Sequence, residues 1–285
     1  MKTGKVSESI LKRSVLREVK ILRSEVLVGA AVGEDCAVME LADDEVFVMS
    51  TDPITGTTRD IGALSINVTL NDLASAGAEP VGVLLSCLLP EYIEEKDIRE
   101  IMHQVSEECA KLNVQVMGGH TEVTKAVRQP VITVTGVGKV VKGREIKTGG
   151  ARAGDDIIVT KWIGLEGTSI IAKEKEDELK ERFSADFIEN AKKFDEMFSV
   201  VADAMTAVSV GVHAMHDVTE GGIFGALWEM GESSKVGLEI DLRAIPIRQE
   251  TVEICNYYDI NPYGLISSGS MLMAAADGAA VVKAL

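Results

Sequence analysis

The sequence predicts two domains, each built from interleaved strands and helices in α/β or α+β layers. Its 285 residues are enough for two domains with buried cores. Hydrophobic residues make up 46% of the chain and aromatic residues only 4%, so we expect cores of Val, Ile, Leu, Ala and Met. A glycine-dense stretch from Gly143 to Gly154 is typical of a domain junction. We therefore expect one domain over residues 1–145 and another over residues 150–285.

The elements of the first half follow from the spacing of apolar residues. Residues 7–23 combine apolar positions at helical intervals with a basic face, which predicts an amphipathic helix. Two short apolar runs with a polar turn between them predict a hairpin of strands 36–40 and 45–50. The elements predicted after this hairpin are a central helix over 60–78, a strand over 81–88, a helix over 94–112 and strands over 114–117 and 130–137.

The second half repeats this alternation. Residues 173–182 are a charged run with one apolar residue, which indicates a solvated helix face or an exposed connection. The other predicted elements are strands over 156–161, 212–215, 238–242 and 271–276, and helices after 164–167 and over 198–209, 223–230 and 249–257.

Charge and composition exclude several classes of protein. The formal net charge of −16 argues against binding of nucleic acid through the general field of the protein, because phosphate backbones attract basic surfaces. The four cysteines are widely spaced and form no C-x-x-C pair, so we expect free thiols in a cytoplasmic protein. The sequence shows no signal peptide and no run of about 18 apolar residues, so we expect no membrane span.

An amide and a carboxylate, Asn71 and Asp72, stand side by side in the apolar central helix. A buried carboxylate is costly unless it is paired or bound to a cation, so Asp72 needs a partner from elsewhere in the chain. Three polar clusters offer one: Gly33-Glu34-Asp35, Ser50-Thr51-Asp52 and Gly118-Gly119-His120-Thr121-Glu122.

The aspartates Asp35, Asp52 and Asp72 each lie at the end of an apolar element or within one. Loops that converge at one edge of a sheet could bring these carboxylates to a Mg²⁺ ion, to which Glu122 and Asp217 could add. Each of these residues could instead be an ordinary cap or turn residue. The pair Gly221-Gly222 opens a predicted helix and could leave N–H groups free for a phosphate.

These clusters resemble the motifs of the AIR synthase-like (PurM-like) superfamily of ATP-binding enzymes. The resemblance is strongest in five stretches that occur in the order typical of that superfamily. They are Gly33-Glu34-Asp35-Cys36-Ala37-Val38, Ser50-Thr51-Asp52, Asn71-Asp72-Leu73-Ala74-Ser75-Ala76-Gly77-Ala78-Glu79-Pro80, Gly118-Gly119-His120-Thr121-Glu122 and His216-Asp217-Val218-Thr219-Glu220-Gly221-Gly222. Within the superfamily, residues 216–222 and 267–271 most resemble the hydrogenase maturation protein HypE and AIR synthase-related proteins.

The resemblance implies an α+β fold with an N-terminal α+β domain that dimerises by pairing sheets, and a C-terminal α/β domain. ATP would lie between the domains. Asp35, Asp52 and Asp72 match positions that hold Mg²⁺ and phosphates, and Asn71 and Asp217 match positions that line the ATP site. The implied chemistry is activation of an amide-type or other oxygen by ATP, with an iminophosphate-like intermediate and release of ADP and phosphate.

Three departures from the HypE pattern accompany the resemblance. HypE-like chains end in a cysteine that carries the substrate group, whereas the last cysteine here is Cys255. The chain is also shorter than usual at its C-terminal end, so we expect a truncated second domain. Finally, His120 stands where HypE has an aspartate.

We therefore expect a cytoplasmic homodimer that binds ATP and Mg²⁺, acts on a small-molecule substrate, and binds neither nucleic acid nor a membrane. His120 and Glu122 are the candidate catalytic residues, and Asn71, Asp72, Thr121, Asp217, Gly221 and Gly222 the candidate ATP contacts. One alternative is a small-molecule kinase of the thiamine-monophosphate kinase type. The other is a non-catalytic maturation or scaffold partner that docks through the basic helix over 7–23.

Overall fold

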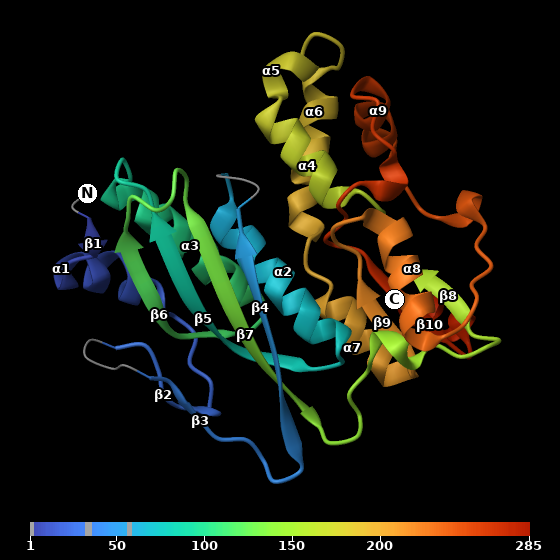
Figure 1. Cartoon of the computed structure of the whole chain (residues 1–285), viewed down its shortest axis with the longest axis horizontal. Helices are drawn as coiled ribbons and strands as arrows, with labels where there is room; N and C mark the ends of the chain where they lie inside the picture. The colour runs from blue at the N-terminus through green and yellow to red at the C-terminus, as the bar shows by residue number, and fades with distance from the viewer. Residues whose placement is uncertain (1–2, 32–35, 56–58) are drawn as a thin grey trace. The chain divides into compact units, whose positions relative to one another are not determined.

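The computed structural model describes residues 3–31, 36–55 and 59–285, and the chain divides into two units (Figure 1). Unit 1 comprises Met1–Leu73 and Ala78–Gly143, and unit 2 comprises Ala74–Gly77 and Arg144–Leu285. No helix within the described ranges has both the length and the apolar content needed to cross a bilayer.

Unit 1 is built on a five-stranded mixed sheet with the order β1-β6-β5-β7-β4. Its strands are β1 (Gly4–Lys5), β4 (Glu45–Ile54), β5 (Glu79–Leu89), β6 (Gln115–Val123) and β7 (Val131–Val141). The helix α3 (Glu95–Lys111) connects β5 to β6, which run parallel, as such a pair requires a crossover. Strand β7 is antiparallel to both of its neighbours, β5 and β4.

The central helix α2 (Ile61–Ser75) packs on one face of this sheet, and Figure 1 shows α3 on the same face. Its side chains Ile66, Leu70 and Leu73 are fully buried. The helix approaches so closely that a Cβ added at Gly136 of β7 would lie 2.8 Å from Cγ2 of Thr69. Gly136 therefore faces α2, and so do the residues of neighbouring strands that pair with it in register.

The predicted helix over 7–23 is only partly confirmed. Helix α1 (Glu8–Ile10) continues as irregular helical turns to Glu18, after which the chain is not helical. Leu22, one of the apolar residues at helical intervals that the predicted helix would bury, is 80% exposed. Two of the basic side chains pair with acids of the same chain: Arg13 with Glu95, and Lys20 with Glu18 and Glu107. This pairing weakens the case for a free basic docking surface.

The predicted hairpin of strands 36–40 and 45–50 is wrong. Both segments contain strands, but β3 (Val38–Met39) pairs with β2 (Val26–Val28), whereas β4 pairs along its whole length with β7. The ten-residue register with β7 places alternate residues of β4 half-buried on the side of α2, and a two-residue partner could not fix so long a strand.

Unit 2 contains a three-stranded antiparallel sheet with the order β8-β10-β9. Its strands are β8 (Asp156–Val159), β9 (Ala214–Asp217) and β10 (Met271–Ala275). Its helices are α4 (Leu165–Glu174), α5 (Glu176–Leu179), α6 (Ala185–Lys192), α7 (Val201–Val210), α8 (Gly222–Ser234), α9 (Gln249–Tyr257) and α10 (Gly278–Ala284). One core cluster joins α8 to the sheet, and a second joins α4, α6 and α9. The predicted strand over 238–242 is wrong, because this segment pairs with no strand in the part of the chain that the structure describes.

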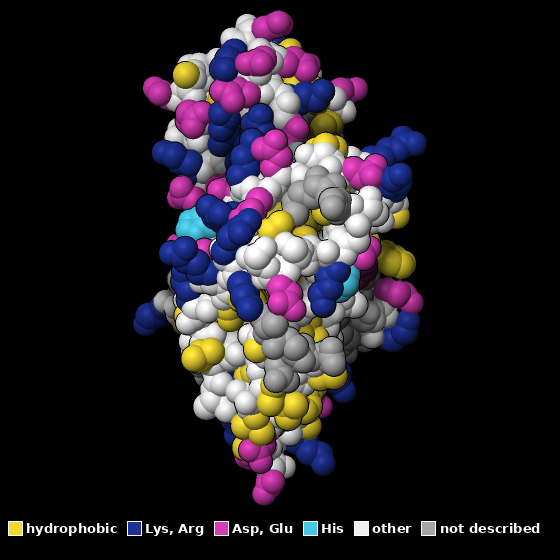
Figure 2. All heavy atoms as spheres, turned by 90° about the vertical axis from the view of Figure 1, so that its left-hand side faces the viewer, with side chains coloured by type: hydrophobic (Ala, Val, Ile, Leu, Met, Phe, Trp, Pro, Cys, Tyr) yellow, Lys and Arg dark blue, Asp and Glu magenta, His cyan; other side chains and the backbone are white. Residues whose placement is uncertain are grey.

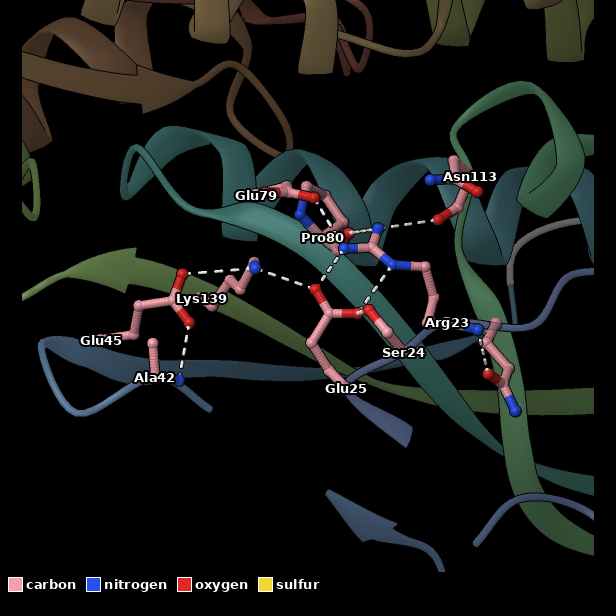
Figure 3. Close-up of polar contacts among 10 residues, drawn as sticks. Arg23, Ser24, Glu25, Ala42, Glu45, Glu79, Pro80, Asn113 and Lys139 are labelled. Atoms are coloured by element: carbon pink, nitrogen blue, oxygen red, sulfur yellow. Dashed lines mark hydrogen bonds and ion pairs between the residues drawn. The ribbon is translucent and has the colours of Figure 1, made fainter. Parts of the chain in front are cut away.

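An ion network ties the segment after α1 to the sheet of unit 1 (Figure 3). The Arg23 side chain is 9% exposed, and its Nη2 lies 2.7 Å from a carboxylate oxygen of Glu25 and of Glu79. Arg23 Nη1 also donates to the carbonyl oxygen of Asn113 at 3.0 Å. Lys139 Nζ of β7 lies 2.8 Å from Glu25 Oε1, the same oxygen that Arg23 Nη2 contacts. The guanidinium and the ammonium hold the pKa of Glu25 well below its ordinary value of 4.5.

Replacement of Arg23 by Met should destabilise the protein by about 3 kcal/mol at pH 7, because it leaves a half-buried carboxylate without its main partner. Because the folded-state pKa of Glu25 is depressed, the stability that this group supplies is present above pH 4.5 and is lost as the pH falls below it. Urea unfolding at pH 7 and pH 4 measures both effects. Lys20→Met is the control, since the Lys20 side chain is 46% exposed. An equal loss of unfolding free energy in both variants would contradict the proposed contribution of Arg23 to stability.

Candidate functional site

The carboxylate of Asp72 faces strand β4 across the interface between α2 and the sheet. Ser50 of β4 pairs in register with Gly136 and therefore also faces α2. The Ser50 hydroxyl donates a hydrogen bond to the carboxylate of Asp72. Asp52, two residues further along β4, lies on the same face, and Ser50 Oγ is also 3.4 Å from Asp52 Oδ2. The structure therefore brings the predicted metal ligands Asp52 and Asp72 together around one hydroxyl.

Burial raises the pKa of Asp72 from its ordinary value of 3.8 to about 6, because the charged form loses water at this position. The hydrogen bond from Ser50 opposes this effect, whereas the negative charge of Asp52 adds to it. A divalent cation between the two carboxylates would stabilise their charged forms and so offset both the desolvation and the repulsion that raise this pKa.

The residues present fit a Mg²⁺ ion in the chemistry of their oxygen atoms, although the described chain supplies only a pair of them. Asp35, the third predicted ligand, lies outside the described residues. Within the described ranges, no group of three or more His, Cys, Asp or Glu side chains could hold a metal ion. Mg²⁺ is usually held by one or two carboxylates together with substrate phosphates and water, so a pair of carboxylates suffices when a nucleotide supplies the remaining ligands.

His120 and Glu122 lie on strand β6, which extends to Val123, beyond the strand predicted over 114–117. The two residues are two apart and therefore share a face, and His120 Nε2 lies 3.2 Å from Glu122 Oε2. His120 pairs in register with Ser86 of β5. His120 and Ser86 line a hollow of about 610 Å³, together with Thr133 and Thr135 of β7. An imidazole in contact with a carboxylate in a hollow of this size can accept or donate a proton to a bound molecule.

The buried candidates are Thr121, which lies in strand β6 of the sheet, and Asn71, which lies in α2. Thr121 alternates with His120 along β6, and its hydroxyl hydrogen-bonds to the thiol of Cys87, whose pKa burial raises to about 12. Thr121 is 7% exposed, and Asn71 of α2 is fully buried beside Asp72. Contacts of these two side chains with a nucleotide remain predictions.

The remaining candidates, Asp217, Gly221 and Gly222, belong to unit 2. Asp217 ends strand β9 and is 5% exposed. Gly221 and Gly222 start α8 with φ angles of +86° and +62°. A Cβ at Gly222 would lie 2.5 Å from the carbonyl oxygen of Tyr263, and the Gly222 N–H donates to Thr219 at 3.0 Å. This glycine is therefore needed for close packing, and its N–H is already used within the chain.

The strand order decides which candidates meet within unit 1. Strands β6 and β4 are separated by β5 and β7, so His120 lies roughly 14 Å from β4 at the usual strand spacing. His120 and Glu122 also lie on the sheet face opposite to Asp52. Residues paired in register share a face, so His120 shares one with its partner Ser86 and with Thr133, which pairs with Ser86. Asp52 pairs with Val134, the next residue along β7, and therefore lies on the other face, toward α2. Within one chain the structure forms two separate clusters: Ser50, Asp52 and Asp72 form the carboxylate cluster, and His120 and Glu122 form the His–Glu pair.

Two polar residues were not among the candidate site residues predicted from the sequence. Ser50 belonged to one of the clusters that could supply a partner for Asp72, and its position two residues from Asp52 in a strand places it on the same face and within reach of Asp72. The second is Glu166 of α4, which belongs to unit 2 and not to either cluster. It is 4% exposed, and burial raises the pKa of its carboxyl.

Two family models cover most of the chain. Residues 33–140 match the N-terminal domain of AIR synthase related proteins, and residues 152–285 match the C-terminal domain. A putative hydrogenase expression/formation protein of Methanocaldococcus jannaschii is 30% identical over 95% of this chain and 80% of its own length. The carbamoyl dehydratase HypE of Cupriavidus necator is 30% identical over 89% of this chain and 72% of its own length.

Solved structures share the fold. The hydrogenase maturation protein HypE in complex with ATP is 22% identical, with a TM-score of 0.84, over 99% of this chain and 82% of that one. Thiamine-monophosphate kinase of Stenotrophomonas maltophilia is also 22% identical, with a TM-score of 0.77, over 97% and 88%. HypE in its complex with HypF is 21% identical, with a TM-score of 0.71, over 84% and 77%. These likenesses confirm the predicted two-domain α+β fold.

The buried carboxylate of Asp72 should make stability depend on pH when no metal is present. Its folded-state pKa of about 6 exceeds its ordinary value of 3.8, so the free energy of unfolding should fall as the pH rises from about 4 to about 6. Asp72→Asn should lack this fall and gain up to about 3 kcal/mol over the wild type at pH 7. Urea unfolding in the presence of a chelator measures this difference. Parallel curves for the two proteins would contradict the buried-charge assignment.

Proposed function

Because the chain belongs to the AIR synthase related protein family, we propose that it is an ATP-dependent enzyme that activates an oxygen of a small substrate and releases ADP and phosphate. The observation that carries this proposal is the carboxylate cluster, in which Asp52 and Asp72 lie around the Ser50 hydroxyl. A carboxylate buried between a helix and a sheet, beside a second carboxylate, is unfavourable for folding, and a bound cation would explain why the chain keeps this pair.

In this proposal Asp52 and Asp72 hold Mg²⁺ together with Asp35, which the sequence motif supplies. Bound there, Mg²⁺ would neutralise charge on the phosphate oxygens. The hydrogen bond from Ser50 keeps the Asp72 carboxylate oriented toward β4. Asn71, Thr121, Asp217, Gly221 and Gly222 are proposed ATP contacts from the motif resemblance, and Asp217 and the two glycines belong to the second unit.

We assign proton transfer to the His–Glu pair. The carboxylate of Glu122 orients the imidazole of His120, which lines the hollow beside three hydroxyl-bearing side chains: Ser86, Thr133 and Thr135. A small polar substrate could be held by these hydroxyls while His120 accepts or returns a proton. Because the pair lies far from the carboxylate cluster of the same chain, a complete site would need a second copy or a substrate that spans the sheet.

The substrate class we favour is an amide. Several relatives carry the name carbamoyl dehydratase, which describes removal of water from a carbamoyl group. In a balanced reaction of this class, the amide oxygen takes the γ-phosphoryl group of ATP and ADP leaves. The C–O bond then breaks, phosphate departs with the oxygen, and the nitrogen gives up its protons to a base.

A small-molecule kinase is the second candidate, because the fold is also shared with thiamine-monophosphate kinase. A kinase would leave the γ-phosphoryl group on the product. The two candidates therefore differ in whether phosphate or a phosphorylated substrate accumulates.

We also propose that the chain forms a homodimer in the cytoplasm through unit 1, which corresponds to the N-terminal domain over residues 1–145. Figure 2 shows hydrophobic side chains gathered low on the face that it draws. On the side of β4 that turns away from α2, Phe47 is 51% exposed and Met49 is 63% exposed. Leu27 of β2 and Val38 of β3 are further exposed apolar residues of unit 1. A second copy would cover such a surface.

A maturation protein is the protein partner we propose, since a solved relative is a complex of HypE with HypF. The basic residues after Ser7 are a weaker docking candidate than the sequence suggested, because Arg13 and Lys20 are paired within the chain.

Asp72→Asn should weaken Mg²⁺-dependent ATP binding by at least about 10- to 100-fold, which is what loss of a residue that merely supports a metal ligand costs. Calorimetric titration with and without Mg²⁺ measures this effect, and release of phosphate against formation of a phosphorylated product separates dehydratase from kinase. Asp44→Asn is the control, because it removes the same charge from an exposed turn of unit 1. Equal binding by both variants would refute the carboxylate cluster as the metal site.

Met49→Asp should convert the protein from dimer to monomer, because a charge in the centre of an apolar interface leaves a buried carboxylate unpaired. Light scattering during gel filtration measures the molar mass. Val210→Asp on α7 is the control, since Val210 is 40% exposed and lies in unit 2. A wild-type monomer at all concentrations would exclude this interface.

A further inference from the structure

The hollow that His120 lines is also bordered by an ammonium group, that of Lys5. Lys5 belongs to β1, which runs antiparallel beside β6 at the edge of the sheet of unit 1 (Figure 1). It pairs in register with Glu122, and residues paired in register share a face of the sheet. Lys5 therefore lies on the face that carries His120 and Glu122.

The ammonium of Lys5 is not used in an ion pair. Lys5 is exposed, and no salt bridge joins it to a carboxylate in the part of the chain that the structure describes. Its register partner Glu122 contacts His120 instead, at 3.2 Å. Other basic residues of unit 1 do pair with acids of the chain, among them Arg13, Lys20, Arg23 and Lys139. Lys5 can therefore give its charge to a ligand.

The described lining of the hollow contains no carboxylate, although the chain carries a formal net charge of −16. Glu34 and Asp35 lie outside the described residues. The titratable side chains that line the hollow are an amine, an imidazole and two thiols, those of Lys5, His120, Cys36 and Cys87. Because most of so acidic a protein repels anions, a hollow bordered by an unpaired ammonium is a favourable place for a negatively charged group.

The lining fits a carboxylate better than a phosphate. A phosphate monoester carries a charge of about −1.5 to −2 at pH 7, whereas one ammonium balances a single negative charge. Arginine, which binds phosphate with two parallel hydrogen bonds, is absent from the described lining. A carboxylate can accept hydrogen bonds both from the Lys5 ammonium and from a neighbouring hydroxyl, of which Ser86, Thr133 and Thr135 are available in the hollow.

The strand register sets the distance between Lys5 and His120. Lys5 pairs with Glu122, so His120, two residues away on β6, is its diagonal neighbour. The Cβ atoms of such neighbours lie roughly 7–8 Å apart, which suits a ligand with polar groups at both ends of a short carbon chain. The hollow also offers apolar side chains to pack against such a chain, including Leu11, Val15, Leu16 and Leu84.

We propose that Lys5 is a specificity residue of this hollow, and that the amide substrate bound there carries a carboxylate on a short carbon chain. This inference rests on the proposed function, because the amide is the substrate class favoured above. The Lys5 ammonium donates to the carboxylate, while the amide lies at His120. A neutral diamide loses the ion pair with Lys5, and a dicarboxylate places its second negative charge close to Glu122.

The test uses the whole protein and three probes of equal length: succinamate, succinamide and succinate. Titration followed by saturation-transfer NMR measures the dissociation constant of each. The wild type should bind succinamate about tenfold more tightly than the other two. Lys5→Met should lose the preference over succinamide, and Lys5→Arg should keep it. Lys125→Met is the matched control, because it removes the same charge from a side chain of unit 1 that is 76% exposed and outside the described lining.

Calorimetric titration of the same variants with ATP and Mg²⁺ separates this inference from the proposed function. Lys5→Met should bind ATP as the wild type does. Absence of ATP binding in all variants would refute the proposed function and leave the preference for succinamate intact. Four results would overturn the inference: no binding of succinamate, equal binding of succinamate and succinamide, the same preference in Lys5→Met as in the wild type, or displacement of succinamate by ATP alone, which would identify the hollow as a nucleotide site.

Discussion

The contact between Asp72 of α2 and Ser50 of β4 constrains the rest of unit 1. It forces a carboxylate into the interface between helix and sheet, where burial raises its pKa to about 6. The helix can approach this closely because Gly136 has no side chain to keep Thr69 away. The same register places Asp52 beside Ser50, so one helix–sheet contact both builds the fold and concentrates negative charge. A cation that relieves this charge would stabilise the fold and prepare the site for phosphate at the same time.

The sheet of unit 1 holds the carboxylate cluster and the His–Glu pair apart. Its order puts β6 and β4 three strand spacings apart, and the alternation of side chains puts His120 and Asp52 on opposite faces. A reaction that uses the carboxylate cluster and the His–Glu pair would therefore need two chains or a substrate that reaches around the sheet. The exposed Phe47 and Met49 lie on the face that turns away from α2, where a second copy could bring its own residues near.

Much of the fold could be predicted from the sequence, because the core elements carry long regular patterns. The helix over 60–78, the strands over 81–88 and 130–137, and the helix over 94–112 are confirmed within a few residues. Pairing of strands could not be predicted, since apolar alternation says which side of a strand is buried but not which strand lies beside it. This limit explains the wrong hairpin. The pairing of Asp52 with Asp72 followed from the cost of a buried acid, whereas the distance of His120 from both depends on strand order.

The central claim is that Asp52 and Asp72 hold the metal of a bound nucleotide. The most direct measurement replaces Mg²⁺ by paramagnetic Mn²⁺ in the presence of ATP and follows the amide signals of the isotopically labelled protein by NMR. The account predicts selective broadening at Ser50, Asp52 and Asp72, with the same signals unaffected in Asp72→Asn. Broadening confined to the neighbourhood of His120 and Glu122, or absent from β4 and α2, would contradict it.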